Sequence, residues 1–218
     1  ADVGVMDAWK LTAGTPDVVV AVCDAAVKYT HPDLEANMWT NEAELNGTKG
    51  VDDDKNGYVD DKYGYNFVRN TAITSWTSNG STGHGTHVAG TIAAVNDNGI
   101  GVAGIAGGGN GQRGVKIMTL QLFDGMNSAT LAMEARAMKY AADNGAVILQ
   151  CSWGYNSAKA NLIMGYTPGP ATEEEWAAQF PLEKEALDYF IHNAGSPNGV
   201  IDGGLAIFAS GNEYAAQS

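Results

Sequence analysis

Two histidines in a glycine-rich stretch are the residues best placed to do chemistry. His84 and His87 follow a polar loop and open a run of small and apolar residues, which predicts a helix with both imidazoles on its first turn. Three small residues would let this helix lie close against a sheet: Gly85, Ala89 and Gly90. A rigidly held histidine at a cleft can act as a general base, but a core histidine or a zinc pair has the same spacing.

Polar side chains also follow two apolar runs that predict buried strands. The run Val18–Cys23 ends at Asp24, and the run Leu205–Ala209 is followed closely by Asn212. A carboxylate that binds one imidazole nitrogen fixes the tautomer and leaves the other nitrogen to accept a proton, while an amide can bind an oxyanion. With His84, these residues form a candidate constellation for acyl transfer.

Predicted strands and helices alternate along most of the 218 residues. This order favours one α/β domain with a mostly parallel sheet and right-handed crossovers, in which sites form at the carboxyl edge. The predicted strands are 18–23, 115–123, 146–151 and 205–209, and the predicted helices are 6–11, 84–91, 128–143 and 182–192.

An acidic loop predicts a calcium site. Asp52, Asp54, Asn56 and Asp60 occupy the first, third, fifth and ninth positions of an EF-hand-type loop, and the carbonyl of Tyr58 stands at the seventh. Tyr63 occupies the twelfth position, where a bidentate glutamate would be, so Asp61 or another segment must complete the shell. An unliganded acidic turn is the alternative.

Composition excludes several classes of partner. The formal net charge of −13 makes a nucleic acid an improbable ligand, because the surface would repel phosphates. No apolar run approaches the length of a membrane span, and we expect a mature segment from which any signal peptide has been removed. Cys23 and Cys151 end two buried strands and are expected to be free thiols.

Four motifs together resemble the subtilisin family of serine proteases: Val20–Asp24 with His31–Leu34, Gly83–Thr91, Ser152–Gly154, and Ala209–Glu213. The resemblance implies a three-layer α/β fold, present here in part. It also implies that Asp24 orients His84, that His84 is the general base and then the general acid, and that Asn212 stabilises the oxyanion. Subtilisin is itself a reference case for these roles, which come from the resemblance. His87 is then structural.

The resemblance also implies sites for substrate and for a second calcium ion. Two segments would offer backbone to an extended polypeptide: Asp124–Gly125 and Ser152–Trp153–Gly154. Three residues would line the pocket for the side chain that precedes the cleaved bond: Ala209, Ser210 and Gly211. The second calcium ion would be held by the Asp33 carboxylate and by oxygens of the loop 95–102, at Val95, Asn98, Ile100 and Val102.

The chain departs from the family pattern in three places. Ala25 and Ala26 stand where the family has Ser or Thr and then Gly, so we expect altered support for Asp24 without loss of its role. The segment 155–181 is loop-like in composition and is expected to be an insertion. No serine up to Ser218 matches the family's Gly-Thr-Ser nucleophile motif, so residues 1–218 are expected to be a catalytic domain truncated before the nucleophile and inactive by themselves.

We therefore predict a secreted, extracellular or cell-surface serine endopeptidase with calcium as its cofactor. Its expected partners are a polypeptide substrate and the remaining C-terminal part of its own domain. One alternative is a subtilase-like binding protein without catalysis, which the Ala25 and Ala26 departure makes conceivable. The other is a zinc hydrolase built on His84 and His87, although the sequence lacks the glutamate of the H-E-x-x-H motif.

Overall fold

The strand β1, Val19–Ala25, lies in the middle of the main sheet and is buried along its whole length. Apolar side chains on both of its faces explain this position, because a central parallel strand is covered by helices on both sides. The predicted strand 18–23 is confirmed, and β1 runs two residues further toward the C-terminus than expected. The computed structural model describes residues 3–78, 81–156, 165 and 167–212.

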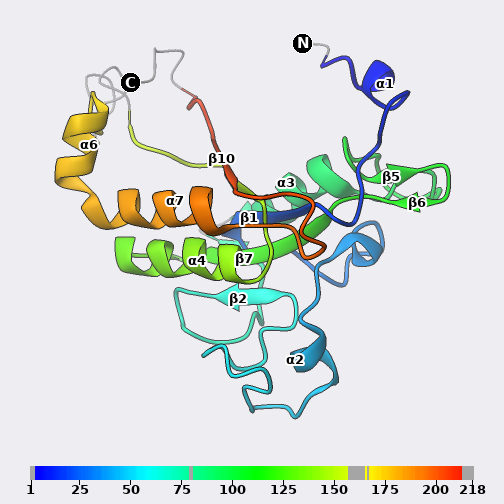
Figure 1. Ribbon diagram of the computed structural model, residues 1–218, viewed down its shortest axis with the longest axis horizontal. Coiled ribbons are helices and arrows are strands. Elements are labelled where there is room, and N and C mark those ends of the chain that lie inside the picture. The colour runs from blue at the N-terminus through cyan, green and yellow to red at the C-terminus, as the bar shows by residue number, and fades with distance from the viewer. Residues whose placement is uncertain (1–2, 79–80, 157–164, 166, 213–218) are drawn as a thin grey trace.

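The strands around β1 are parallel in the order β10, β9, β1, β7, β2 (Figure 1). Their bounds are Leu205–Phe208 for β10, Ile148–Cys151 for β9, Lys116–Asp124 for β7 and Gly64–Asn66 for β2. A short strand β8, Asn127–Ser128, turns back antiparallel to the end of β7. Two small antiparallel strand pairs do not join the main sheet: β3, Thr77–Ser78, with β4, Ser81–Thr82, and β5, Gly108–Gly109, with β6, Gln112–Arg113.

Helices cover both faces of the sheet and complete three layers. On one face α4, Leu131–Asp143, and α7, Pro181–Asn193, lie side by side (Figure 1). Their apolar side chains pack on Ala21, Cys23 and Leu120 in the larger core cluster. On the other face α3, His84–Ala93, packs on Val20 and Val22. This arrangement confirms the predicted α/β class and its mostly parallel sheet.

Short helices lie around these layers. They are α1, Val5–Ala8, the 3₁₀ turn Glu35–Asn37, α2, Glu42–Asn46, and α6, Glu173–Gln179. The helix predicted over 6–11 is therefore shorter than expected. The helix predicted from 128 begins at Leu131, because Ser128 pairs in β8.

The segment 155–181 contains more structure than its composition indicated. Residues 157–164 and 166 lie outside the described part, but α6 forms where Thr172 caps three successive glutamates, its hydroxyl accepting a hydrogen bond from Glu175 N–H at 3.2 Å. Acidic residues on the first turn favour a helix start through the helix dipole. Within the described residues, none of the helices has both the length and the apolar character that a membrane crossing requires.

Candidate active site

Asp24 and His84 meet at the carboxyl end of β1. Asp24 is 2% exposed, and its two carboxylate oxygens lie 2.7 Å and 2.9 Å from Nδ1 of His84. The His84 side chain is 49% exposed, so one end of the ring is fixed while the other faces the surface. A carboxylate at Nδ1 favours the tautomer that carries its proton there, which leaves Nε2 as the acceptor.

Local backbone geometry aims the Asp24 side chain. β1 is in regular register with β7 up to Asp24 opposite Gln121, and the register then shifts so that Ala25 lies opposite Phe123. Such an irregularity at a strand end redirects a side chain. The Ala25 N–H donates to Asp24 Oδ1 at 2.7 Å, so the backbone supports the carboxylate although Ala25 lacks a hydroxyl.

The helix α3 approaches β1 so closely that only glycine fits at Gly85. A Cβ atom on Gly85 would lie 2.0 Å from the Ala25 carbonyl oxygen. Gly83 caps the helix with a φ of 102°, a conformation that favours glycine. Ala89 is fully buried, whereas a Cβ on Gly90 would meet no described atom within 4 Å. The expected close approach is therefore confirmed for Gly85 and Ala89, and Gly90 does not contribute to it among the described residues.

Burial sets the electrostatics of the pair. Loss of solvent raises the pKa of Asp24 above its usual value, and the hydrogen bond and charge of His84 act in the opposite direction. A buried carboxylate beside an imidazole stabilises the imidazolium that forms when the ring accepts a proton. The pair is therefore suited to general base catalysis.

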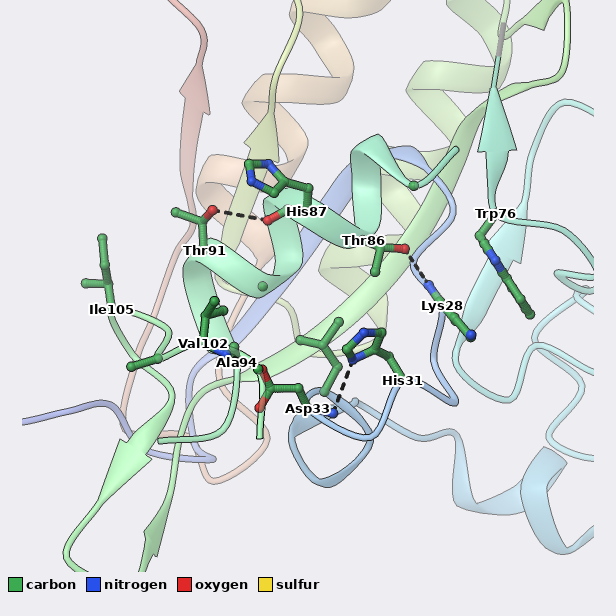
Figure 2. A pocket seen from close by; sticks show the side chains of 15 residues that line it. Lys28, His31, Asp33, Trp76, Thr86, His87, Thr91, Ala94, Val102 and Ile105 are labelled. Carbon is green, nitrogen blue, oxygen red and sulfur yellow. Dashed lines mark hydrogen bonds between the residues drawn. The ribbon is translucent and has the colours of Figure 1, made fainter. Parts of the chain in front are cut away.

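His87 has different surroundings, although it lies only one helical turn from His84. It is exposed and lines a separate cavity of about 700 Å³, together with His31 and Asp33 (Figure 2). Within the described residues, the group of three side chains that could hold a metal consists of Glu44, Asp52 and Asp54, and neither histidine of α3 belongs to it. This geometry disfavours the zinc pair.

The other predicted site residues gather at the same edge of the sheet. Cys23, Cys151 and Phe208 are aligned across β1, β9 and β10. The segments that follow these three residues therefore leave the sheet side by side, with Ala209 N–H donating to the Cys151 carbonyl at 3.0 Å. Asp24, Ser152 and Ala209 therefore begin three neighbouring segments at this edge, and Asn212, three residues beyond Ala209, is exposed.

A cavity of about 680 Å³ opens between the two segments that follow β9 and β10. Four predicted substrate-site residues line it: Trp153, Gly154, Ala209 and Ser210. The Trp153 ring is fixed by its Nε1–H, which donates to the Cys23 carbonyl at 2.8 Å, and by an edge contact with Phe208 at 5.5 Å between centroids. Ser152 and Gly211 flank the cavity in the sequence without lining it.

Sequence reasoning missed another wall of this cavity. Tyr155, Trp176 and Glu183 line it, and the Glu183 carboxylate accepts hydrogen bonds from the Tyr155 hydroxyl and from Trp176 Nε1–H. A signal was present, because Glu183 precedes Ala186, Leu187 and Phe190 at helical spacing on the buried face of α7. An acidic residue on an apolar helix face marks an unusual environment.

Asp124 and Gly125 end β7, on the other side of β1 from the cavity. The Asp124 side chain is buried and accepts hydrogen bonds from Asn66 Nδ2 at 2.9 Å and from the Arg69 guanidinium. Its backbone is paired with Asn127 of β8. The carboxylate therefore joins β2 to β7.

Carboxylates of the acidic loop accept hydrogen bonds from backbone N–H groups of the loop and of the residues just before it. Asp52 accepts from Asn56 N and Gly57 N at 3.1 Å and 2.8 Å, and Asp60 Oδ2 accepts from Gly50 N at 2.8 Å. Glu44 of α2, which sequence reasoning missed, is 1% exposed and has a carboxylate oxygen within 4.8 Å of oxygens of Asp52 and Asp54. No sequence pattern identifies Glu44, because it comes from a preceding helix.

Asp61 anchors this loop to the core. It is fully buried and accepts hydrogen bonds from Tyr140 Oη at 2.6 Å, Asn41 Nδ2 at 2.9 Å and Asn56 Nδ2 at 3.0 Å. Burial raises the pKa of Asp61, and the hydrogen bond from Tyr140 partly offsets this. Asp61 thus holds the loop by hydrogen bonds to side chains.

The predicted second calcium site also comes together, but through internal hydrogen bonds. Asp33 is 2% exposed; its Oδ1 accepts from Asn98 Nδ2 at 2.8 Å, and its Oδ2 accepts from Val102 N at 2.9 Å. Asn98 Oδ1 accepts from Ile100 N at 2.8 Å, and Val95 N donates to the Asp33 carbonyl at 2.9 Å. A cation here would have to displace the Asn98 amide from Asp33.

The two cysteines are buried free thiols, as expected. They are paired in register on β1 and β9. The hydrogen bond with Cys151, and to a smaller extent burial, raises the pKa of the Cys23 thiol. A raised pKa keeps the thiol protonated and unreactive. They therefore belong to the core.

Sequence comparison relates this chain to proteases. The family model described as Subtilase family matches residues 15–218. Subtilisin-like protease 1 of Plasmodium vivax is 51% identical over 88 residues, which are 40% of this chain and 13% of that protein. The thermophilic serine proteinase of Bacillus sp. strain AK1 is 34% identical over 147 residues, which are 67% of this chain and 28% of that protein.

Structural comparison gives the same relation. The crystal structure of fervidolysin from Fervidobacterium pennivorans, described as a keratinolytic enzyme related to subtilisin, is 26% identical with a TM-score of 0.55, and the match covers 94% of this chain and 23% of that one. The chain thus spans less than a third of the length of each of these three relatives. Because the family model matches nearly all of the chain, this protein belongs to the subtilase family.

Proposed function

We propose that this protein is a serine endopeptidase in which His84 is the general base, Asp24 orients it and Asn212 stabilises the oxyanion. The observation that carries the proposal is the contact of 2.7 Å between the buried Asp24 carboxylate and Nδ1 of the half-exposed His84. The nucleophile would be a serine in sequence that follows Ser218, and the remaining C-terminal part of the domain would be the structural partner of these layers.

The proposed reaction uses the carboxyl edge of the sheet. Nε2 of His84 removes the proton from the serine hydroxyl as the oxygen attacks the peptide carbonyl, and Asp24 stabilises the resulting imidazolium. The Asn212 amide donates a hydrogen bond to the oxyanion, and His84 then returns the proton to the leaving amine. Gly154 and the backbone of Ser152 would pair with the substrate as an added strand.

A serine-directed fluorophosphonate tests this function in the full-length protein. Labelling should occur in the wild type and should fall by at least about 10³-fold in rate on His84→Ala, because the base is removed. His87→Ala is the matched control on the same helix and should retain labelling. Undiminished labelling of His84→Ala would show that another residue is the base.

A non-catalytic binding protein is the competing outcome. The sequence after Ser218 decides it, because a Gly-Thr-Ser motif there supports the protease and its replacement contradicts it.

We also place the enzyme outside the cell or at its surface, on the basis of its family. Finding the active enzyme confined to the cytosol by fractionation would contradict that location.

Calcium is the proposed cofactor of the acidic loop. The side chains that gather there offer only oxygens, and the ion Ca²⁺ prefers such ligands. The proposed ligands are those of the loop together with Glu44: Asp52, Asp54, Asn56, the Tyr58 carbonyl, Asp60 and Glu44. Bound calcium would offset the mutual repulsion of these carboxylates and would stabilise the loop against unfolding.

Chelation tests the calcium proposal without using activity. Excess EGTA should lower the melting temperature, because a ligand that binds only the folded state stabilises it. The EGTA effect should shrink on Asp52→Asn and should persist on Asp188→Asn, which alters an exposed carboxylate on α7. A melting temperature that EGTA leaves unchanged would refute this site.

The second calcium ion, at Asp33, is the other part of the cofactor proposal. It requires the Asn98 amide to turn so that its oxygen, and not its nitrogen, faces the cation together with Asp33. Calorimetric titration should give two calcium ions per chain in the wild type and one on Asp33→Asn. A single ion in the wild type would remove this second site.

A further inference from the structure

The cavity of about 680 Å³ beside the carboxyl edge has walls of one charge sign. The aromatic rings of Trp153, Trp176 and Phe208 contribute to its apolar surface, and its charged residues are Glu173 and Glu183. Among the described residues that line it, none is a lysine, an arginine or a histidine. The cavity therefore combines aromatic walls with negative charge.

Glu183 is a buried carboxylate in the lining of this cavity. It is 3% exposed, and the partners of its Oε2 are the Tyr155 hydroxyl and Trp176 Nε1–H, which are both neutral. In the described part of the chain, no ion pair joins Glu183 to a basic group. Removing a carboxylate from water costs several kcal/mol, and neutral donors do not cancel its charge, so this carboxylate is a suitable partner for a cation that enters the cavity.

The surroundings reinforce this negative potential. Burial and then the charge of Glu183 raise the pKa of Glu134, on the neighbouring helix α4, to about 7. Lys184, the next residue along α7, bonds to Asp188 at 2.6 Å and is not among the residues that line the cavity. The protein thus supplies no positive charge of its own to Glu183 within the described residues.

We propose that this cavity binds a basic side chain, lysine or arginine, at the substrate position immediately before the cleaved bond. This inference rests on the proposed function, which places the cavity next to the scissile bond. The aliphatic stem of the side chain would pack against the contacting rings of Trp153 and Phe208, while its cationic end pairs with Glu183. A purely apolar side chain would fill the aromatic part and leave the carboxylate unpaired.

Matched peptides test the preference in the full-length enzyme. A series that differs only in the residue before the cleaved bond, with Arg, Lys, Leu or Phe there, should give kcat/KM at least about tenfold higher for Arg and Lys. Glu183→Gln keeps an acceptor for Trp176 and Tyr155 but removes the charge, so the ratio of Arg to Leu should fall by about 10- to 100-fold. Glu185→Gln, an exposed glutamate on the same helix, is the control and should leave the ratio unchanged.

A binding probe separates this inference from the proposed function. Benzamidine, an aromatic cation, should change the fluorescence of Trp153 and Trp176 in the wild type, and its affinity should fall at least about tenfold on Glu183→Gln. Neutral benzamide should bind weakly to both. If the wild-type full-length protein neither hydrolyses the peptides nor reacts with the fluorophosphonate, the proposed protease function is refuted. A preference for Leu or Phe would refute the basic pocket, and so would benzamidine binding that Glu183→Gln leaves unchanged.

Discussion

The carboxyl end of β1 and the first turn of α7 each bury a carboxylate, to nearly the same degree. Asp24 is 2% exposed and Glu183 is 3% exposed. Asp24 contacts the ring nitrogen of His84, which becomes a cation when it accepts a proton, whereas the hydrogen-bond donors to Glu183 within the described residues are the neutral groups of Tyr155 and Trp176. Equal burial therefore serves two different purposes, and the partner decides which.

The difference also lies in how each site is held. Asp24 is fixed by a strand end, by the Ala25 N–H and by the close approach of α3 at Gly85. Glu183 is on the first turn of α7, outside the sheet, and its side chain contacts Trp176 of α6 and Tyr155. A site that orients a base requires rigid support, while a site that receives a side chain requires space.

Removal of the Asp24 charge should have the largest effect. For Asp24→Asn we expect kcat to fall by about 10⁴-fold on every substrate, the scale known for subtilisin itself as the reference enzyme. Stability should stay the same or rise, because burial raises the pKa of Asp24 and the ionised group is costly in the folded state. Kinetics and thermal melting measure both. If Asp24→Asn lowered kcat only for substrates with Lys or Arg before the cleaved bond, Asp24 and Glu183 would not have the separate roles that we propose.

A methyl group at Gly85 should have the next largest effect. Gly85→Ala places a Cβ 2.0 Å from the Ala25 carbonyl oxygen, so α3 must shift at a cost of about 1–3 kcal/mol. A displacement of His84 by about 1 Å would lower kcat by roughly 100-fold. Chemical denaturation and kinetics measure the two effects.

Gly109→Ala is the control for Gly85→Ala. A Cβ on Gly109 makes only an ordinary contact, 3.6 Å from the Ala13 side chain. We expect stability and kcat close to those of the wild type. Equal behaviour of the two variants would show that the region around Asp24 does not depend on the close approach of the helix.

The pH dependence of stability near Glu183 should show the smallest effect. The pKa of Glu134 rises from about 4.5 when unfolded to about 7 when folded, so the folded state holds this proton more tightly. The contribution of Glu134 to the free energy of unfolding is therefore fully present below about pH 4.5, is lost as the pH rises to about 7, and does not change above that pH. Because Glu134 is partly exposed and solvent screens its charge, we expect the free energy of unfolding to fall by about 1 kcal/mol, which lowers the melting temperature by roughly 2–4 °C.

Glu134→Gln should remove that decline. The variant should melt a few degrees higher than the wild type at pH 8 and at nearly the same temperature at pH 4.5. Melting curves across this range provide the measurement. A decline as steep in the variant as in the wild type would show that the titration of Glu134 does not cause it.

Several features could be predicted from local sequence because they depend on short-range physics. Continuous apolar residues in Val18–Cys23 specify a central strand, the small residues after His84 specify a close-packed helix, and alternation of elements specifies a parallel sheet. Asp24, His84 and Asn212 could be named because they follow or begin such elements. The order of the strands and their register could not be derived in this way.

The wall of the cavity shows what the tertiary structure alone decided. The helical spacing of Glu183 with Ala186 and Leu187 places it on a buried face, but only the packing of α6 and Tyr155 determines that its partners are neutral. Glu44 joins the acidic loop from a separate helix for the same reason. Local sequence fixes which side chains each element presents, whereas the contacts between distant elements fix the charge and solvent around them, and these set what the side chains can do.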